Sequence, residues 1–178
     1  MTLQEINRLD ALANNILVSS QLEAGRYRSP REELNFSDLV SSAVENFKNR
    51  FPNWHWTGKI EQEADITGDA ALLQILVNNL LENAVKYSPR EGKIECRLAL
   101  KDHTIQLQVI DEGPGIPDNE KKKVFEKFYR IGNEATRTTK GTGLGLYLCK
   151  KIVEEHHGTI QVTDNSPSGC NFTVSFFT

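Results

Sequence analysis

Residues 73–88 predict a helix whose apolar body is crossed by one polar stripe. At about 100° per residue, its aliphatic side chains fall on one arc; they are Leu73, Leu76, Val77, Leu80 and Ala84. Asn79, Asn83 and Lys86 share a separate narrow arc beside it. Amide oxygens and an ammonium at this spacing suit a hard cation next to a neutralised anion, which indicates a magnesium-bound phosphate. A solvated face that carries the same residues is the alternative, and this helix alone does not decide between them.

Composition narrows the class of protein. The chain has 178 residues, enough for one domain plus an appendage, and its 38% apolar and 25% charged residues predict a buried core. A net charge of −3 argues against a nucleic-acid partner. Its three cysteines lack metal-type spacing and indicate reduced thiols. No apolar run approaches the roughly 20 residues that cross a bilayer. We therefore expect a cytoplasmic piece, although upstream segments could anchor a longer parent in the inner membrane.

Three helices are expected in the first half of the chain. Apolar residues at steps of three and four over 3–24 predict a bundle-type helix that stops at Gly25. Such a helix needs a partner, which we expect to be absent from the chain or intermolecular. Ser37 is expected to cap a second helix over 38–50, and Asp69 to cap the helix described first.

The remaining pattern predicts strands and shorter helices. Two alternating runs, 94–100 and 105–109, indicate a hairpin with one buried face, and the same alternation buries Asp111 at the strand end. A carboxylate there is costly unless a donor reaches it. The other expected elements are strands at 54–60, 159–163 and 170–177, and helices at 118–127 and 144–157. Together they predict an α/β layer sandwich.

Two further constellations point to chemistry. A buried Asp111 can accept a hydrogen bond from an exocyclic amine such as that of adenine, and Gly113 and Gly115 let the backbone approach a ring closely. The glycines of Gly141–Gly145 precede a helix, where free N–H groups and the helix dipole attract phosphate oxygens. That glycine pattern lacks the preceding strand of a dinucleotide fingerprint and the Lys-Ser/Thr of a P-loop. Each signal is weak alone, whereas their order and spacing together are specific.

These residues resemble the ATP-binding catalytic domain of bacterial sensor histidine kinases, of the GHKL superfamily shared with DNA gyrase and mismatch-repair ATPases. The resemblance rests on four boxes in order: the N box at Asn79–Tyr87, the G1 box at Asp111–Ile116, the F box at Phe125–Arg130 and the G2 box at Gly141–Leu146. It implies a two-layer α/β sandwich with a mixed, mostly antiparallel sheet of about five strands packed on three helices, preceded by one bundle helix.

The resemblance also implies roles for the polar residues. Asn83 ligates Mg²⁺ through its side-chain oxygen, Asn79 supports that site, and Lys86 offsets phosphate charge. Tyr87 lines the nucleotide pocket, and Asp111 accepts from the adenine amino group.

The remaining implied roles lie in the loops. Gly113, Gly115 and Ile116 shape the adenine floor, and residues 131–142 form an ATP lid. Arg130 is a candidate for the γ-phosphate or for contact with the phosphoacceptor domain, with a solvated ion pair as the alternative. Backbone donors and packing are expected from Gly141, Thr142, Gly143, Leu144, Gly145 and Leu146.

The family's phosphoacceptor histidine is not recognisable in the chain. It sits in a helix and is followed directly by an acid, and none of the four histidines, His55, His103, His156 and His157, has that context. Residues 1–25 resemble the end of the second dimerisation-bundle helix, 26–34 a linker and 35–178 the catalytic domain. We therefore expect a fragment that binds ATP and Mg²⁺ without autophosphorylating.

The expected partners are the histidine domain of the same parent, which is expected to be a homodimer, and a response regulator. Hydrolytic relatives place a carboxylate at the position of Asn79, and an amide cannot act as a base, which favours transfer over hydrolysis. The alternatives are an anti-sigma-type serine protein kinase, which shares the pocket, and a nucleotide-binding module without catalysis.

Overall fold

The computed structural model describes residues 2–132 and 141–178. Its helices are α1 (Leu3–Glu23), α2 (Phe36–Arg50), α3 (Ala70–Tyr87) and α4 (Gly145–Glu155), with a single 3-10 turn, η1 (Lys123–Phe125). Its strands are β1 (Glu32–Asn35), β2 (His55–Ile60), β3 (Asp65–Gly68), β4 (Lys93–Lys101), β5 (Thr104–Asp111), β6 (Thr159–Asp164) and β7 (Cys170–Phe177).

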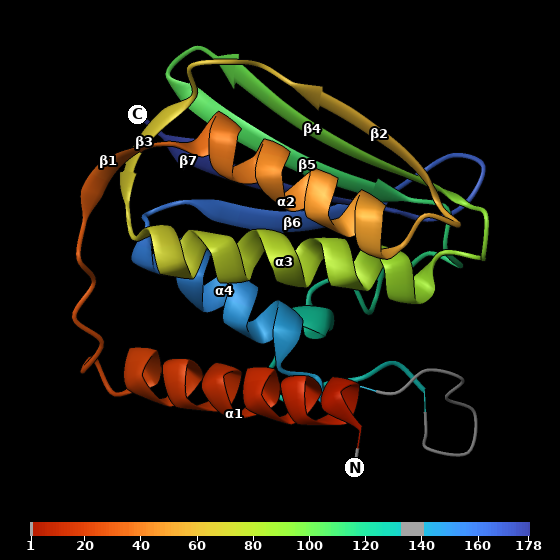
Figure 1. Ribbon diagram of the computed structural model, residues 1–178, viewed down its shortest axis with the longest axis horizontal. Helices are drawn as coiled ribbons and strands as arrows, with labels where there is room; N and C mark the ends of the chain where they lie inside the picture. The colour runs from red at the N-terminus through yellow and green to blue at the C-terminus, as the bar shows by residue number, and fades with distance from the viewer. Residues whose placement is uncertain (1, 133–140) are drawn as a thin grey trace.

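Five strands form one mixed sheet in the order β2-β4-β5-β7-β6. The β2–β4 pair is parallel, and the other three pairs are antiparallel. Helices α2, α3 and α4 cover one face of this sheet, while β1 and β3 pair separately at the margin (Figure 1). The predicted two-layer α/β fold, preceded in the chain by one helix, is confirmed.

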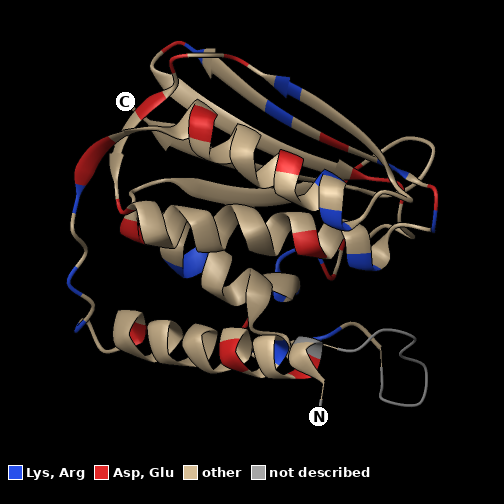
Figure 2. Cartoon of the chain, viewed as in Figure 1, with Lys and Arg blue, Asp and Glu red and all other residues tan. Residues whose placement is uncertain are grey.

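The core lies between the sheet and α3. On β5 the alternate residues Ile105, Leu107 and Val109 are fully buried, and Asp111 follows them on the same face. The apolar arc of α3 is buried against them, as predicted. Apart from the capping Asp69 at its start, the charged residues of α3 lie in its C-terminal half (Figure 2). The core therefore fixes the rotation of α3, and with it the direction of the polar stripe.

Helix capping matches the prediction at α3 and differs at α2. Asp69 caps α3, because its Oδ1 accepts from Leu72 N at 3.1 Å. The predicted cap at Ser37 is wrong: Asn35 caps α2 and accepts from Asp38 N at 3.0 Å. The Ser37 hydroxyl instead donates to the Glu61 carbonyl at 2.6 Å and accepts from Ala64 N at 3.0 Å. A tertiary contact therefore takes over the side chain that local sequence assigns to the cap.

The structure differs from the sequence-based expectations in three other places. The helix expected over 118–127 is reduced to η1, because turns closed by Glu120 N to Pro117 O and Val124 N to Glu120 O take its place. Strands β1 and β3 were not predicted, since four residues are too few to show a period of two. Helix α4 ends two residues before the expected 157, where His157 adopts a left-handed φ of 56°.

Helix α1 lies along α4 (Figure 1). Its C-terminal turns bury Val18 and Ser19, so the expectation that its partner is absent from the chain is wrong for this part. Its N-terminal turns keep apolar side chains exposed, including Leu3 and Leu9. Among the described residues, no helix is both long and apolar enough to cross a bilayer.

The end of α4 docks on the start of α3 through a neutral histidine. His156 Nε2 accepts from Asp69 N at 3.0 Å, which leaves Nδ1 to donate to the Ile152 carbonyl at 2.7 Å. Burial lowers the pKa of His156 from its ordinary 6.5, partly offset by the Ile152 carbonyl. The folded state therefore disfavours the protonated imidazole.

This histidine predicts a pH dependence of folding. Its contribution to the free energy of unfolding is fully present above the unfolded pKa of 6.5 and is lost as the pH falls from there through the lower folded pKa. We expect His156→Gln to lower stability at about pH 7.5 and to flatten the loss between there and about pH 5, as measured by urea unfolding. His157→Asn is the control, because this neighbouring side chain is exposed. A pH profile identical to that of the unmodified chain would contradict the assignment.

Candidate functional site

Three segments far apart in the sequence meet where α3 ends and α4 begins. A Cβ added at Gly145 would lie 3.5 Å from Asn79 Oδ1, and one added at Gly141 would overlap Lys86 Nζ. One added at Gly113 would lie 2.9 Å from the Tyr87 carbonyl oxygen. The polar stripe, the turn after β5 and the glycine-rich loop therefore form one site at one end of the fold (Figure 1).

Asp111 is a buried carboxylate with one oxygen committed to the backbone. It is 4% exposed, and its Oδ1 accepts from Gly113 N at 2.8 Å and from Cys170 N at 3.3 Å. Within the described ranges, both hydrogen bonds to this carboxylate end on Oδ1. Burial raises the pKa of Asp111, and the two N–H donors oppose that shift. Oδ2 is therefore left to accept from a donor outside the chain, such as an amine.

The turn after Asp111 offers backbone atoms, rather than side chains, to the site. A Cβ at Gly113 would lie 2.8 Å from Asp111 Oδ1, so no larger residue fits without moving the carboxylate. Gly115 has a φ of +80°, which glycine adopts without strain. Ile116 is half-buried and packs against the core. Their assignment to the adenine floor stays a prediction.

The polar stripe of α3 contains an unpaired donor. Asn79 is 8% exposed, and its Nδ2 has no hydrogen-bond partner in the described structure. A buried N–H without a partner is costly, so this amide is suited to an external acceptor. Asn83 and Lys86 follow on the same side and are half-buried. Lys86 Nζ lies 5.0 Å from the ring centroid of Tyr87, which is 41% exposed.

The glycine-rich loop leads into α4 without a side-chain cap. Leu144 is buried and takes the capping position, and Thr142 Oγ1 accepts from Leu144 N at 3.4 Å. The first N–H groups of α4, beginning with Gly145 and Leu146, have no partner inside the helix. Free N–H groups at a helix start and the helix dipole attract anionic oxygens, so this end of α4 is a candidate anion site.

Gly143 joins this loop to the segment after η1. Its φ is +72°, and a Cβ there would lie 2.6 Å from the Phe128 carbonyl carbon. Phe128 N donates to the Gly143 carbonyl at 3.0 Å. Arg130 lies on the same side, since a Cβ at Gly141 would be 3.8 Å from its Nε. Most of the predicted lid, residues 133–140, lies outside the described residues.

The sequence did not reveal the loop between β6 and β7. Asn165 Nδ2 donates to the Asp111 carbonyl at 3.0 Å, and a Cβ at Gly169 would overlap that same carbonyl oxygen. This loop therefore holds Asp111 from the far side. Its sequence signal is a short run of turn-forming residues, Asn165-Ser-Pro-Ser-Gly169, before the last strand.

The residues present fit a magnesium ion shared with a ligand. Among the described residues, no group of three His, Cys, Asp or Glu side chains could hold a metal by itself. The amide of Asn83 offers one hard oxygen, so phosphate oxygens and water would have to complete an octahedron.

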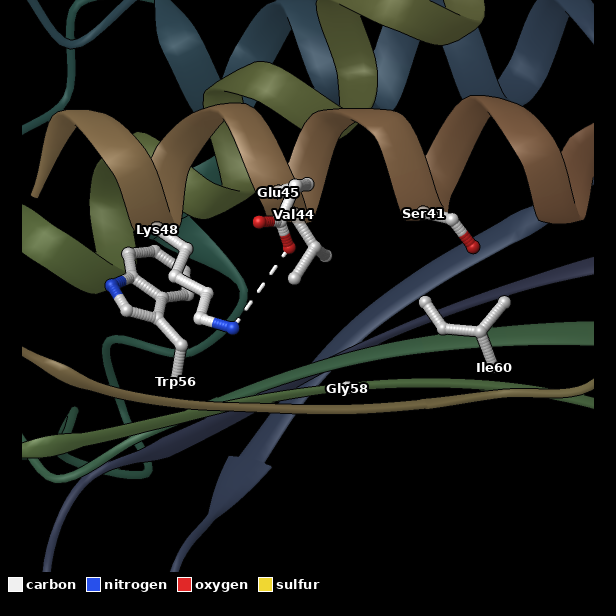
Figure 3. A pocket seen from close by; sticks show the side chains of 7 residues that line it. All are labelled: Ser41, Val44, Glu45, Lys48, Trp56, Gly58 and Ile60. Carbon is white, nitrogen blue, oxygen red and sulfur yellow. Dashed lines mark ion pairs between the residues drawn. The ribbon is translucent and has the colours of Figure 1, made fainter. Parts of the chain in front are cut away.

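The hollow in Figure 3 is a different place. It has a volume of about 330 Å³ and lies between α2 and β2, lined by Ser41, Val44, Glu45, Lys48, Trp56, Gly58 and Ile60. No predicted site residue lines it. The site at the end of α3 lies elsewhere, around Asn79, Lys86 and Asp111.

Comparison with known proteins identifies relatives. The model of the family described as "Histidine kinase-, DNA gyrase B-, and HSP90-like ATPase" matches residues 68–178. The chain is 34% identical over 181 residues to the signal transduction histidine-protein kinase/phosphatase MprB of Mycolicibacterium paratuberculosis, covering 98% of this chain and 33% of the relative. It is 40% identical over 175 residues to the sensor histidine kinase TmoS of Ectopseudomonas mendocina, covering 90% and 17%. The chain thus spans a third or less of these relatives.

Solved structures of histidine kinases have a similar fold. The mycobacterial sensor histidine kinase MprB matches with a TM-score of 0.73 and 29% identity, over 83% of this chain and 97% of that chain. The catalytic domain of histidine kinase ThkA matches with a TM-score of 0.72 and 26% identity, over 83% and 95%.

The glycine after Asp111 gives a test of this geometry. We expect Gly113→Ala to lower the free energy of unfolding by about 1–3 kcal/mol. The new methyl group would lie 2.8 Å from Asp111 Oδ1 and 2.9 Å from the Tyr87 carbonyl oxygen. Gly58→Ala is the matched control, since its Cβ would lie 3.9 Å from Val44 Cγ1, an ordinary van der Waals contact. Urea unfolding measures both. Equal stabilities of the two variants would contradict the packing around Asp111.

Proposed function

The chain belongs to the histidine kinase-, DNA gyrase B- and HSP90-like ATPase family, and on that premise we propose that it binds ATP with Mg²⁺ at the end of α3. In a longer sensor histidine kinase it donates the γ-phosphoryl group to a histidine of the dimerisation domain. One observation carries the proposal. A buried carboxylate with one uncommitted oxygen, an unpaired buried amide and an uncapped helix N-terminus converge on one site.

The adenine end of the site is assigned to the turn after β5. Asp111 Oδ2 accepts from the exocyclic amino group, while Oδ1 stays fixed by Gly113 N and Cys170 N. A fixed acceptor oxygen beside a backbone without side chains favours a planar ring that carries a hydrogen-bond donor on one edge. Gly115 and Ile116 form the floor, and Tyr87 closes the side towards Lys86.

The phosphate end is assigned to α3 and α4. Lys86 Nζ and the N–H groups at Gly145 and Leu146 neutralise and orient phosphate oxygens, and Arg130 supports them from beside Gly141. Asn83 holds Mg²⁺ through its amide oxygen, with Asn79 behind it. When bound, the ion offsets charge on the transferring phosphoryl group.

The chemistry needs a nucleophile that the described site does not contain. A histidine imidazole nitrogen attacks the γ-phosphorus while the bond to the bridging oxygen breaks and ADP leaves. Among the described histidines, His156 is committed to Asp69 at the opposite end of α3, and His103 sits in the β4–β5 turn. We therefore assign the acceptor to another domain, with residues 1–25 as a bundle helix, 26–34 as a linker and 35–178 as the catalytic domain.

Transfer is preferred over hydrolysis, because the amide of Asn79 cannot deprotonate water. The further recipient in this proposal is a response regulator. In this proposal the domain works in the cytoplasm as part of a homodimeric parent. An anti-sigma-type serine kinase and a non-catalytic nucleotide module are the outcomes against which it is tested.

Phosphoryl transfer gives the deciding experiment. We expect the chain alone, with radiolabelled ATP and Mg²⁺, to acquire no acid-labile phosphate. Added to the histidine-bearing helical bundle of its parent protein, it should label that bundle with acid-labile, base-stable phosphate. Labelling of the chain itself would refute the assignment of the acceptor to another domain, and ATP binding with no labelled bundle would favour the non-catalytic module.

The metal assignment has its own test. We expect Asn83→Ala to weaken Mg-ATP binding about tenfold or more by calorimetry while changing metal-free ATP binding little, because only the metal ligand is lost. Asn78→Ala is the matched control, since Asn78 bonds to Gln74 at 2.9 Å on another side of α3. Equal losses with and without Mg²⁺ would remove Asn83 from the metal site.

A further inference from the structure

The segment between α1 and β1 crosses the end of the fold opposite the nucleotide site. Residues 24–31, here called the strap, run past the point where α3 begins and α4 ends (Figure 1). Most of the strap is exposed, and only Tyr27 and Ser29 are half-buried. What holds the strap therefore depends on a few side chains.

Asp69 divides its two oxygens between two tasks. It is 1% exposed, and its Oδ1 caps α3 through Leu72 N. Its Oδ2 accepts from the Tyr27 hydroxyl at 3.1 Å and from the Ser29 hydroxyl at 3.2 Å. Burial and the Asp69 charge raise the pKa of Tyr27, so its phenol remains a donor. The cap and the strap contacts are thus geometrically separate on one carboxylate.

The same residue is tied to α4 through its backbone. Asp69 N donates to His156 Nε2, and a Cβ at the preceding Gly68 would lie 2.8 Å from the His156 ring. The Arg31 guanidinium donates to the Glu155 carbonyl beside it. The strap therefore rests on the start of α3 and the end of α4 together.

The strap continues directly from the end of α1. Directly before it, the Glu23 carboxylate accepts from Tyr147 Oη at 2.7 Å and pairs with Lys127 Nζ at 2.8 Å. These contacts are exposed, and exposed ion pairs stabilise little. Among the described residues, α1 is otherwise held by its C-terminal turns, where Val18, Ser19 and Leu22 pack against the catalytic layer, so the strap contributes to its position.

We infer that Asp69 is the latch of a releasable strap: while its Oδ2 holds the Tyr27 and Ser29 hydroxyls, α1 stays docked along α4, and when they part, α1 detaches without unfolding α3. The cap on Oδ1 survives the release, because it uses the other oxygen. This device is separate from nucleotide binding and does not depend on it.

Hydrogen exchange followed by mass spectrometry tests the latch on the whole chain. In Tyr27→Phe/Ser29→Ala we expect amides of the strap and of α1 to exchange about tenfold faster or more, since two charge-assisted bonds are lost. Amides of α3 and the sheet should keep their rates within about twofold. Ser20→Ala, which removes an exposed hydroxyl on α1, is the matched control and should leave all rates unchanged.

Asp69→Ser provides a second variant. Serine is a good N-cap but has no second oxygen to hold the strap. We expect the strap and α1 to be released again while α3 stays protected, and small-angle scattering to show a larger radius of gyration. Unchanged exchange in the strap of either variant would overturn the latch. So would a uniform rise across α3 and the sheet, which would make these hydroxyls general stabilising contacts.

Discussion

Helix α3 is packed on the sheet with α2 and α4 on either side, and its apolar side chains are buried completely. Leu73, Leu76 and Leu80 have no exposed surface, and burial of each such leucine is worth about 1.5–3 kcal/mol. Turning the helix by one residue, about 100°, would bring polar groups into this contact. The packing therefore allows a single rotation, and that rotation sends Asn79, Asn83 and Lys86 to the edge where β5 ends and α4 begins.

Much of the fold could be predicted because its signals are local. Alternation defined the β4–β5 hairpin and the buried side of Asp111, and a capping aspartate marked the start of α3. The failures arose where distant residues intervene. Ser37 has the chemistry of a cap, yet the Glu61 carbonyl takes its hydroxyl. The β1–β3 pair is too short to carry a period, and its existence depends on strands meeting across the molecule.

The candidate site divides in the same way. Its three motifs converge because each lies at the end of an element, and the layer arrangement brings those ends together. The loop that supports Asp111 from behind was missed, since the need for Gly169 is set by a backbone oxygen 58 positions earlier in the chain. The ligands assigned to individual residues follow from chemistry and family likeness, and the site geometry is compatible with them.

The length of α3 has a geometric consequence for the site. Its 18 residues form a rod about 27 Å long, with Asp69 at one end and Tyr87 at the other. Helix α4 runs back alongside it, and the His156–Asp69 bond joins the two at the strap end. A tilt of about 2° about that joint would carry the far end of the rod by about 1 Å, roughly a third of a hydrogen-bond length. The side chains assigned to phosphate binding therefore lie at the end of α3 farthest from that joint, where a given tilt displaces them most.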